Sequence, residues 1–136
     1  MYQAKHASTR PPPGTAKKRI LVVDDQDATR SALAWLLGDV YEVTTAADGA
    51  EGLELAQAIR PDLVVADVWM PKMNGVQMVE LMKAIPKLHA VPVIFLTGQD
   101  SPMSVISGIV AGARNYLVKP IDPALLEEKI RRALGV

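Results

Sequence analysis

The sequence predicts an α/β fold in which five parallel strands form a doubly wound sheet with helices on both faces. Short apolar runs typical of strands alternate five times with stretches whose apolar residues recur at helical spacing. The connections are short, and right-handed crossovers limit the arrangements that they allow. The most polar strand belongs at an edge of the sheet, which the strand order 2-1-3-4-5 provides.

Two of the predicted strands are continuous apolar runs and therefore belong in the middle of the sheet. Residues 19–23 contain Ile-Leu-Val-Val, and residues 63–67 contain Leu-Val-Val-Ala. Such runs are typical of strands that are buried on both faces of a parallel sheet. Both end in carboxylates, because Asp24 and Asp25 follow the first run and Asp67 ends the second.

Three further strands are expected, of which the second along the chain is the most polar. It reads Tyr-Glu-Val-Thr-Thr, an alternation typical of an edge strand with one half-buried face. The fourth strand ends at Thr97-Gly98, and the fifth ends at Lys119-Pro120. These three strands are predicted to cover residues 41–45, 91–96 and 115–118.

A helix is predicted after each strand, because turn or capping residues precede each stretch of helical spacing. The helices start at about Asp27, at Asp48-Gly49, at about Gly75, at Ser101-Pro102 and at Asp122-Pro123. Gly38 and Gly112 suit the ends of the first and fourth helices. Gly52 lies inside the second helix, where glycine costs about 1 kcal/mol relative to alanine. The stripe Val76, Val79 and Met82 is predicted to face inward from the third helix.

Composition and length indicate one globular domain. The chain has 136 residues and no cysteine, which excludes a disulfide framework and a thiol nucleophile and fits a reducing compartment. No apolar run approaches the roughly 20 residues that span a bilayer. The N-terminus lacks the apolar segment of a signal peptide. We therefore expect a cytoplasmic protein that does not contact a membrane.

The N-terminal segment differs in composition from the rest of the chain. Residues 1–18 include the run Pro11-Pro12-Pro13-Gly14 and show no apolar periodicity, which predicts a disordered or extended leader before a domain at 19–136. The first 19 residues carry five bases and no acid, and the rest carries ten bases and fifteen acids. A mildly acidic body argues against broad nucleic-acid binding. Direct DNA binding is not expected either, because no helix-turn-helix motif follows residue 134. A tethering or partner-binding role for the leader stays open.

The carboxyl ends of parallel strands meet at one edge of the sheet, which brings Asp24, Asp25, Asp67, Thr97 and Lys119 together. Three crowded carboxylates raise one another's pKa values unless a cation is present. Oxygen ligands suit Mg²⁺, since the chain has no cysteine and no suitably placed histidine. The lysine and the hydroxyl supply donors for an anion beside the metal. Together these groups predict a phosphoryl-accepting site that acts by positioning and charge neutralisation.

Taken singly, most of these residues have a structural explanation. The pair Asp24-Asp25 can form a turn and a helix cap, Thr97 can be a strand former, and Lys119 a solvated charge. Met70-Pro71 and Gly75 can likewise be explained as turn residues without a functional role. Asp67 is harder to explain in this way, because a strand buried on both faces rarely ends in an acid without a partner.

Four short motifs contain these residues. They are Val22-Val23-Asp24-Asp25, Pro61-Asp62-Leu63…Asp67-x-x-Met70-Pro71-x-x-x-Gly75, Leu96-Thr97-Gly98 and Tyr116-Leu117-x-Lys119-Pro120. In combination they resemble the receiver domain of two-component response regulators, over about residues 19–134. The resemblance implies a flavodoxin-like fold with Asp67 as the phosphoacceptor. It also implies that Asp25, Asp67 and the backbone carbonyl of Trp69 bind Mg²⁺ directly, and Asp24 through water.

The same resemblance implies a switch. Lys119 would pair with the phosphoryl group ahead of a cis Lys119–Pro120 bond, Thr97 would close on the phosphoryl oxygens, and Tyr116 would turn inward behind it. The surface of the fourth helix, fifth strand and last helix would then change its population of states. The implied partners are a sensor histidine kinase or phosphotransfer protein and a downstream protein target. Phosphorylation-linked homodimerisation is left open.

Two tryptophans have two interpretations each. Trp69 lies two residues after Asp67, and Gln99 lies two after Thr97; in the family these positions influence loss of the phosphoryl group. Trp69 either screens the site from water or packs on its loop. Trp35 lies off the inner stripe of the first helix, where it either packs locally or meets the phosphotransfer helices of the kinase.

The leading interpretation is a signalling phosphoacceptor that catalyses only its own phosphorylation and dephosphorylation. The starting methionine and the long leader favour a single-domain protein over a fragment of a larger regulator or hybrid kinase. A flavodoxin-like cofactor protein is one rival, but Asp24-Asp25 would repel a flavin phosphate. A Mg²⁺-dependent phosphatase with an aspartyl nucleophile is another, and it would normally have an acid where Trp69 stands.

Overall fold

The structure alternates strands and helices along the chain. It is a computed structural model, and it describes residues 17–98 and 115–136. The strands are β1 Arg19–Val23, β2 Glu42–Ala46, β3 Leu63–Asp67, β4 Val93–Thr97 and β5 Asn115–Val118. The helices are α2 Asp27–Leu37, α3 Gly49–Ile59, α4 Gly75–Lys83, the 3-10 turn η1 Pro86–Leu88 and α6 Pro123–Leu134. The predicted fourth helix and leader residues 1–16 lie outside the described residues.

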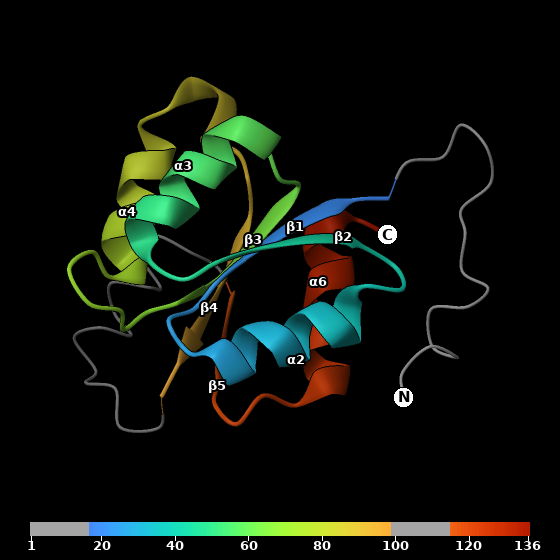
Figure 1. Ribbon diagram of the computed structural model, residues 1–136. Coiled ribbons are helices and arrows are strands. Elements are labelled where there is room, and N and C mark those ends of the chain that lie inside the picture. Colours follow the sequence, from blue (N-terminus) through green and yellow to red (C-terminus); the bar gives the residue numbers. More distant parts are fainter. Residues whose placement is uncertain (1–16, 99–114) are drawn as a thin grey trace.

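The sheet lies between two helical layers. All its strand pairs are parallel, and the order is β2-β1-β3-β4-β5, as predicted. Figure 1 shows α3 and α4 packed on one face of the sheet and α2 and α6 on the other. The sequence-predicted doubly wound α/β fold is therefore confirmed.

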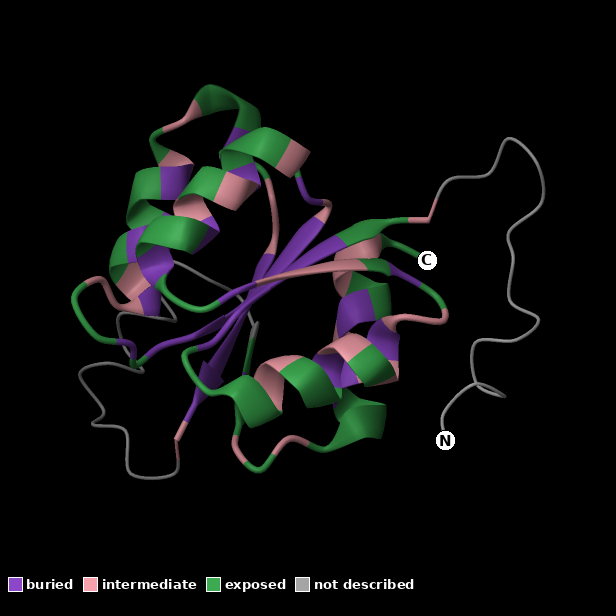
Figure 2. Cartoon of the chain, in the orientation of Figure 1, coloured by how far each residue is buried: buried purple, intermediate pink, exposed green. Residues whose placement is uncertain are grey.

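The core consists of one apolar cluster on each face of the sheet, because alternate residues of a strand point to opposite faces. Leu21, Val64 and Phe95 belong to the cluster under α3 and α4. Val65 and Leu96 belong to the cluster under α2 and α6. The central strands β3 and β4 are buried along their whole length, whereas β2 is mostly part-exposed, as expected of an edge strand. Figure 2 shows the same contrast in colour.

Several element boundaries differ from the prediction by one or two residues. Strand β2 starts at Glu42 because the backbone N–H of Tyr41 donates to the carbonyl of Leu37 (2.9 Å) and so belongs to the end of α2. Strand β4 starts at Val93, since the preceding proline has no N–H to donate. The turn η1 was not predicted, and its Leu88 is fully buried.

Helix packing explains two features that helical spacing left open. A Cβ at Gly52 would lie 2.8 Å from Sδ of Met78 and 2.9 Å from a methyl of Val23, so the glycine lets α3 approach α4 and β1 closely. On α4, Val79 and Met82 are buried as predicted, and the partly buried Val76 also packs against the core. Met78, which the predicted stripe did not include, is fully buried, so the inward face of α4 is wider than predicted.

Candidate functional site

The backbone brings the carboxyl ends of β1, β3, β4 and β5 to one edge. In the strand registers, Val23 lies beside Ala66, and Asp67 lies beside Leu96. Hydrogen bonds continue the ladders past the strand ends: the N–H of Asp24 donates to Ala46 (3.1 Å), and that of Lys119 donates to Thr97 (2.8 Å). These bonds fix the residues that follow each strand, because an unpaired backbone group is costly in a buried sheet.

Three acidic side chains converge at this edge. Asp24 is fully buried, Asp67 is 6% exposed, and Asp25 is exposed. Each offers a carboxylate oxygen, and these oxygens all lie within 4.8 Å of one another. The predicted convergence of Asp24, Asp25 and Asp67 is therefore seen in the structure.

Lys119 joins two of the acids. Its Nζ lies 3.0 Å from Oδ2 of Asp24 and 3.4 Å from Oδ2 of Asp67. Burial alone would lower the pKa of Lys119, but its hydrogen bond to Asp24 and the negative charges of Asp67 and Asp24 raise that pKa above the usual value. The ammonium is thus charged and aimed at the acid pair. The Lys119–Pro120 peptide bond is cis, as the family resemblance implied.

The surroundings of Asp67 disfavour its charged form. Burial raises the pKa of this carboxyl to about 6, and the neighbouring negative charge of Asp24 adds to the effect. Lys119 and the backbone N–H of Trp69, which donates to Oδ1 at 3.2 Å, act in the opposite direction. The pKa values of Asp67 and Lys119 are therefore both raised, but for different reasons: burial and then the charge of Asp24 raise that of the acid, and the two neighbouring acids raise that of the lysine.

The donor set fits a hard divalent cation. Carboxylate oxygens that face one another and are incompletely neutralised are the ligands that Mg²⁺ prefers, and the exposed Asp25 leaves room for water. The chain contributes no cysteine. The backbone N–H of Trp69 donates to Oδ1 of Asp67, which places this residue beside the acids. That the carbonyl of Trp69 is a metal ligand stays a prediction.

Thr97 and Tyr116 lie near the same edge. Thr97 is buried at the end of β4, and its Oγ1 donates to the carbonyl of Gly98 (3.2 Å). Tyr116 on β5 lies beside Phe95 in the register and is 37% exposed. Gln99 lies outside the described residues. The predicted switching motions of Thr97 and Tyr116 therefore stay predictions.

Gly75 has a specific structural requirement. A Cβ at this position would lie 2.1 Å from the carbonyl oxygen of Asp67 and 3.2 Å from Cα of Val68. The N–H of Gly75 also donates to the carbonyl of Val68 (2.9 Å). The start of α4 is thus packed directly against the backbone of the site, which a turn interpretation of Gly75 did not predict.

Sequence reasoning missed two polar residues at the site. The side chain of Gln26 accepts a hydrogen bond from Nζ of Lys119 (3.3 Å), and Arg30 donates from Nη1 to the carbonyl of Asp24 (2.6 Å). The one available signal was position, since both residues closely follow the acid pair at the start of a helix.

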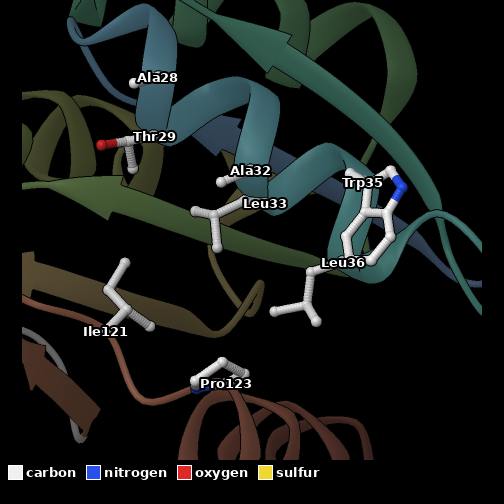
Figure 3. A pocket seen from close by; sticks show the side chains of 8 residues that line it. All are labelled: Ala28, Thr29, Ala32, Leu33, Trp35, Leu36, Ile121 and Pro123. Carbon is white, nitrogen blue, oxygen red and sulfur yellow. The ribbon is translucent and has the colours of Figure 1, made fainter. Parts of the chain in front are cut away.

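The two tryptophans are each 48% exposed. Trp35 lines an apolar groove of about 420 Å³ between α2 and the residues that lead into α6. Figure 3 shows its indole beside Leu36 at one end of this groove, with Ile121 and Pro123 on the opposite wall. The partial exposure of Trp35 and Trp69 is compatible with both interpretations of each residue. Among the described helices, none has the length and apolar character to cross a membrane.

Comparison with known proteins agrees with this geometry. The family model described as the response regulator receiver domain matches residues 20–131 of this chain. The transcriptional regulatory protein AfsQ1 of Streptomyces coelicolor is 37% identical over 85% of this chain and 50% of its own length. The response regulator PleD of Caulobacter vibrioides is 40% identical over 83% of this chain and 25% of its own length. The chain thus spans half or less of the length of these curated relatives.

Two solved structures match this chain over their full length. The chemotaxis protein CheY4 of Vibrio cholerae is 38% identical, with a TM-score of 0.80 over 88% of this chain and 100% of that one. The receiver domain of the sensor histidine kinase PA1611 of Pseudomonas aeruginosa, solved with a magnesium ion coordinated in its active-site cleft, is 28% identical. Its TM-score is 0.81, over 89% of this chain and 100% of that one. The acidic cluster fits the phosphorylation site of such domains, and this chain belongs to the response regulator receiver family.

Proposed function

We propose that this chain accepts a phosphoryl group on Asp67, from a phosphohistidine of a sensor kinase or phosphotransfer protein, and then changes its affinity for a protein target. The observation that carries the proposal is the cluster of Asp24, Asp25 and Asp67 with Lys119 across it. A buried carboxylate, an oxygen-ligand site and an ammonium within 3.4 Å of that carboxylate are the groups that phosphoryl transfer requires.

Asp67 is the better nucleophile of the two buried acids. The oxygens of Asp24 are held by the N–H of Gln26 (2.9 Å) and by Lys119 (3.0 Å). The corresponding bonds of Asp67, from Trp69 and Lys119, are longer at 3.2 and 3.4 Å. An oxygen of Asp67 is therefore less firmly held and more available for attack.

The reaction is a simple displacement. An oxygen of Asp67 forms a bond to phosphorus while the bond from phosphorus to the histidine nitrogen of the donor breaks, and the imidazole keeps that electron pair. Lys119 stabilises the negative charge of the phosphoryl oxygens and Thr97 donates a hydrogen bond to one of them. Asp24, Asp25, Asp67 and the carbonyl of Trp69 would hold Mg²⁺, which when bound neutralises charge on the carboxylates and the phosphoryl group.

The switch follows from a stronger hydrogen bond that Thr97 can make after phosphorylation. Its hydroxyl now donates to a neutral carbonyl, that of Gly98. A phosphoryl oxygen is a charged and stronger acceptor, so phosphorylation favours a state in which the hydroxyl turns toward Asp67. Tyr116 then occupies the space that Thr97 leaves, and the surface of β5 and α6, with the predicted fourth helix, changes its population of states.

The expected setting is a cytoplasmic signalling pathway. The chain catalyses its own phosphorylation and dephosphorylation only, and its target is a protein, without direct contact to DNA or membrane. Phosphorylation-linked homodimerisation through the last two helices is tested by comparing the mass of the phosphorylated and unphosphorylated protein in solution. The rival phosphatase function predicts repeated turnover of an aryl phosphate, which we do not expect.

The decisive experiment is intact mass spectrometry after incubation with acetyl phosphate and Mg²⁺. The wild type and Asp62→Asn gain one phosphoryl adduct, and Asp67→Asn gains none. Asp62 is the matched control because it flanks the same strand at the opposite end. Equal labelling of all three proteins would move the site away from Asp67. Loss of labelling on addition of EDTA supports the metal requirement.

Trp69 sets the lifetime of the phosphorylated form in this proposal. Its half-exposed indole lies two residues beyond Asp67, where it screens the acyl phosphate from attacking water. Trp69→Asn should therefore shorten the half-life of the phosphorylated protein after removal of acetyl phosphate. An unchanged half-life would favour local packing as the role of this side chain.

Trp35 tests recognition of the donor. If the phosphotransfer helices contact α2 at its exposed indole, Trp35→Ala slows phosphorylation by a phosphohistidine donor and leaves phosphorylation by acetyl phosphate unchanged. Equal rates with both donors would favour local packing of Trp35 in its groove.

A further inference from the structure

We infer that Gln26 is a positioning residue for phosphorylation, because its side-chain amide holds the ammonium of Lys119 beside Asp67. The role of Gln26 rests on the proposed function of Asp67 as phosphoacceptor. None of the motifs that define the site includes Gln26, and its nearest contact across the site is 93 positions further along the chain.

The start of α2 does not explain the presence of glutamine at this position. Gln26 is the N-cap residue, with extended backbone (φ −97°, ψ 120°), and its side chain makes no capping hydrogen bond. Serine, threonine, aspartate and asparagine are the residues preferred there, because their short side chains reach the free N–H groups of the first turn. The longer side chain of Gln26 is directed to the site instead.

Three hydrogen bonds fix Gln26 relative to the site. Its backbone N–H donates to Oδ1 of Asp24 at 2.9 Å, which ties the residue to the buried acid. Its Oε1 accepts from Oγ1 of Thr29 and from Nζ of Lys119, both at 3.3 Å. Thr29 is one turn further along α2, so the helix itself orients the amide oxygen toward the ammonium.

The ammonium of Lys119 has three donors, and the described part of the chain places three acceptors within reach. They are Oδ2 of Asp24 at 3.0 Å, Oδ2 of Asp67 at 3.4 Å and Oε1 of Gln26 at 3.3 Å. Two of these acceptors are carboxylates of the cluster that fits a cation, and a bound cation would weaken their bonds to the ammonium by competing for the same oxygens. The amide of Gln26 lies outside that cluster and keeps its bond.

This difference gives Gln26 its effect on the reaction. The side chain of Lys119 is a flexible four-carbon stem with 22% of its surface exposed, and without an anchor it can turn into solvent. The neutral amide holds the charge near Asp67 without adding another negative charge where the phosphoryl group arrives. Gln26 therefore keeps the ammonium of Lys119 in place when the carboxylates of Asp24 and Asp67 bind a cation.

The test compares rates of adduct formation on Asp67 at saturating Mg²⁺ and acetyl phosphate. Gln26→Met keeps the length of the side chain and removes the acceptor, and we expect an about fivefold lower maximal rate, the effect of one lost hydrogen bond to a charged group at a solvent-exposed position. Gln26→Glu restores an acceptor but adds the negative charge that the neutral amide avoids, so its rate should lie between those of Gln26→Met and wild type. Gln57→Met removes an exposed glutamine on α3 and leaves the rate unchanged.

A second readout separates positioning from helix capping. In protein with ¹⁵N-labelled lysine, the ammonium signal of Lys119 exchanges faster with water in Gln26→Met than in wild type, while the free energy of unfolding stays the same. A wild-type rate and wild-type exchange in Gln26→Met would overturn the positioning role. So would a fall in both rate and stability that Gln26→Glu does not restore. Absence of any adduct on Asp67 in the wild type would instead overturn the proposed function itself.

Discussion

Strand β3 has an acid at each end, and the two acids have opposite surroundings. At the amino end, Asp62 is part-exposed, accepts a hydrogen bond from the N–H of Arg19 at 2.7 Å and donates its own N–H to the carbonyl of that residue at 2.8 Å. At the carboxyl end, Asp67 is buried and faces the like charge of Asp24. One acid completes the backbone pairing of the sheet, and the other is held where its charge is unfavourable.

Both acids stand at an end of the same strand, so sequence position does not distinguish them, whereas their surroundings do. A carboxylate that accepts from the free N–H of a strand start stabilises the fold in the same way as a helix cap. A carboxylate buried against another carboxylate destabilises the fold until a cation or a covalent modification removes the repulsion. In the proposed function, the unfavourable surroundings of Asp67 lower the stability of the fold and are relieved when a cation or a phosphoryl group binds there.

The largest expected effect concerns the contact behind Asp67. Gly75→Ala places a Cβ 2.1 Å from the carbonyl oxygen of Asp67, so the backbone of the site must move. We expect a loss of about 3 kcal/mol in the free energy of unfolding, typical of overpacking against backbone, together with slower phosphorylation. Urea unfolding measures the loss. Gly98→Ala is the control, because a Cβ there meets no atom of the described residues within 4 Å. Equal losses in both variants would show that the tight contact has no energetic consequence.

The next effect is the pH dependence that Asp67 imposes. Its pKa is raised from 3.8 to about 6 in the folded protein, so the folded state retains a proton that the unfolded state has lost. Stability without metal should therefore fall as the pH rises from about 4 to about 6, by up to about 3 kcal/mol. Asp67→Asn removes this fall and is more stable than wild type at pH 7 by about 1–3 kcal/mol.

Chemical unfolding in EDTA across this pH range measures the effect, and Mg²⁺ provides the control. If the acidic cluster binds Mg²⁺ as proposed, the cation should stabilise the folded wild type by about 2.7 kcal/mol at a hundredfold excess over Kd. Asp67→Asn should gain much less, since it lacks one of the three carboxylates. A wild type whose stability rises from pH 4 to pH 6 more steeply than that of Asp67→Asn would contradict the repulsion at the carboxyl end.

Asp62→Asn tests the amino end of β3. The amide oxygen can still accept from Arg19, but the bond loses the charge of the carboxylate, so we expect a loss of about 1 kcal/mol at pH 7. Phosphorylation by acetyl phosphate should stay at the wild-type rate, because Asp62 lies at the far end of the strand from the site. A stabilising effect, as expected for Asp67→Asn, would remove the distinction between the two acids.

The sequence predicted the carboxyl-end site well because its geometry follows from topology. Parallel strands with buried sequences place Asp24, Asp67 and Lys119 at one edge whatever the details of packing. The cluster could be assembled from strand ends alone, and the edge position of β2 followed from its polar alternation.

Features set by side-chain direction or by tertiary contact could not be predicted in this way. Gln26 reads as a poor helix cap until Lys119, far along the chain, is known to lie beside it. The burial of Met78 depends on Gly52 of α3, where a Cβ would lie 2.8 Å from Sδ of Met78. Local pattern carries no information about either contact, because both partners are remote in sequence.

The smallest expected effect on stability is that of Glu42, an exposed acid at the same end of the sheet as Asp62. Arg19 also lies 3.6 Å from Glu42 on β2, but these side chains are 52% and 63% exposed. Glu42→Gln should change the free energy of unfolding by less than about 0.5 kcal/mol, since solvent screens exposed pairs. Unfolding of Glu42→Gln and Asp62→Asn in low and high salt measures the difference. If both variants lost the same stability, and salt abolished both losses, the amino end would be held by diffuse electrostatics and not by the backbone bond of Asp62. The backbone bond of Asp62 would then have no energetic role, and the two acids would differ only in the burial of Asp67 and in its repulsion from Asp24.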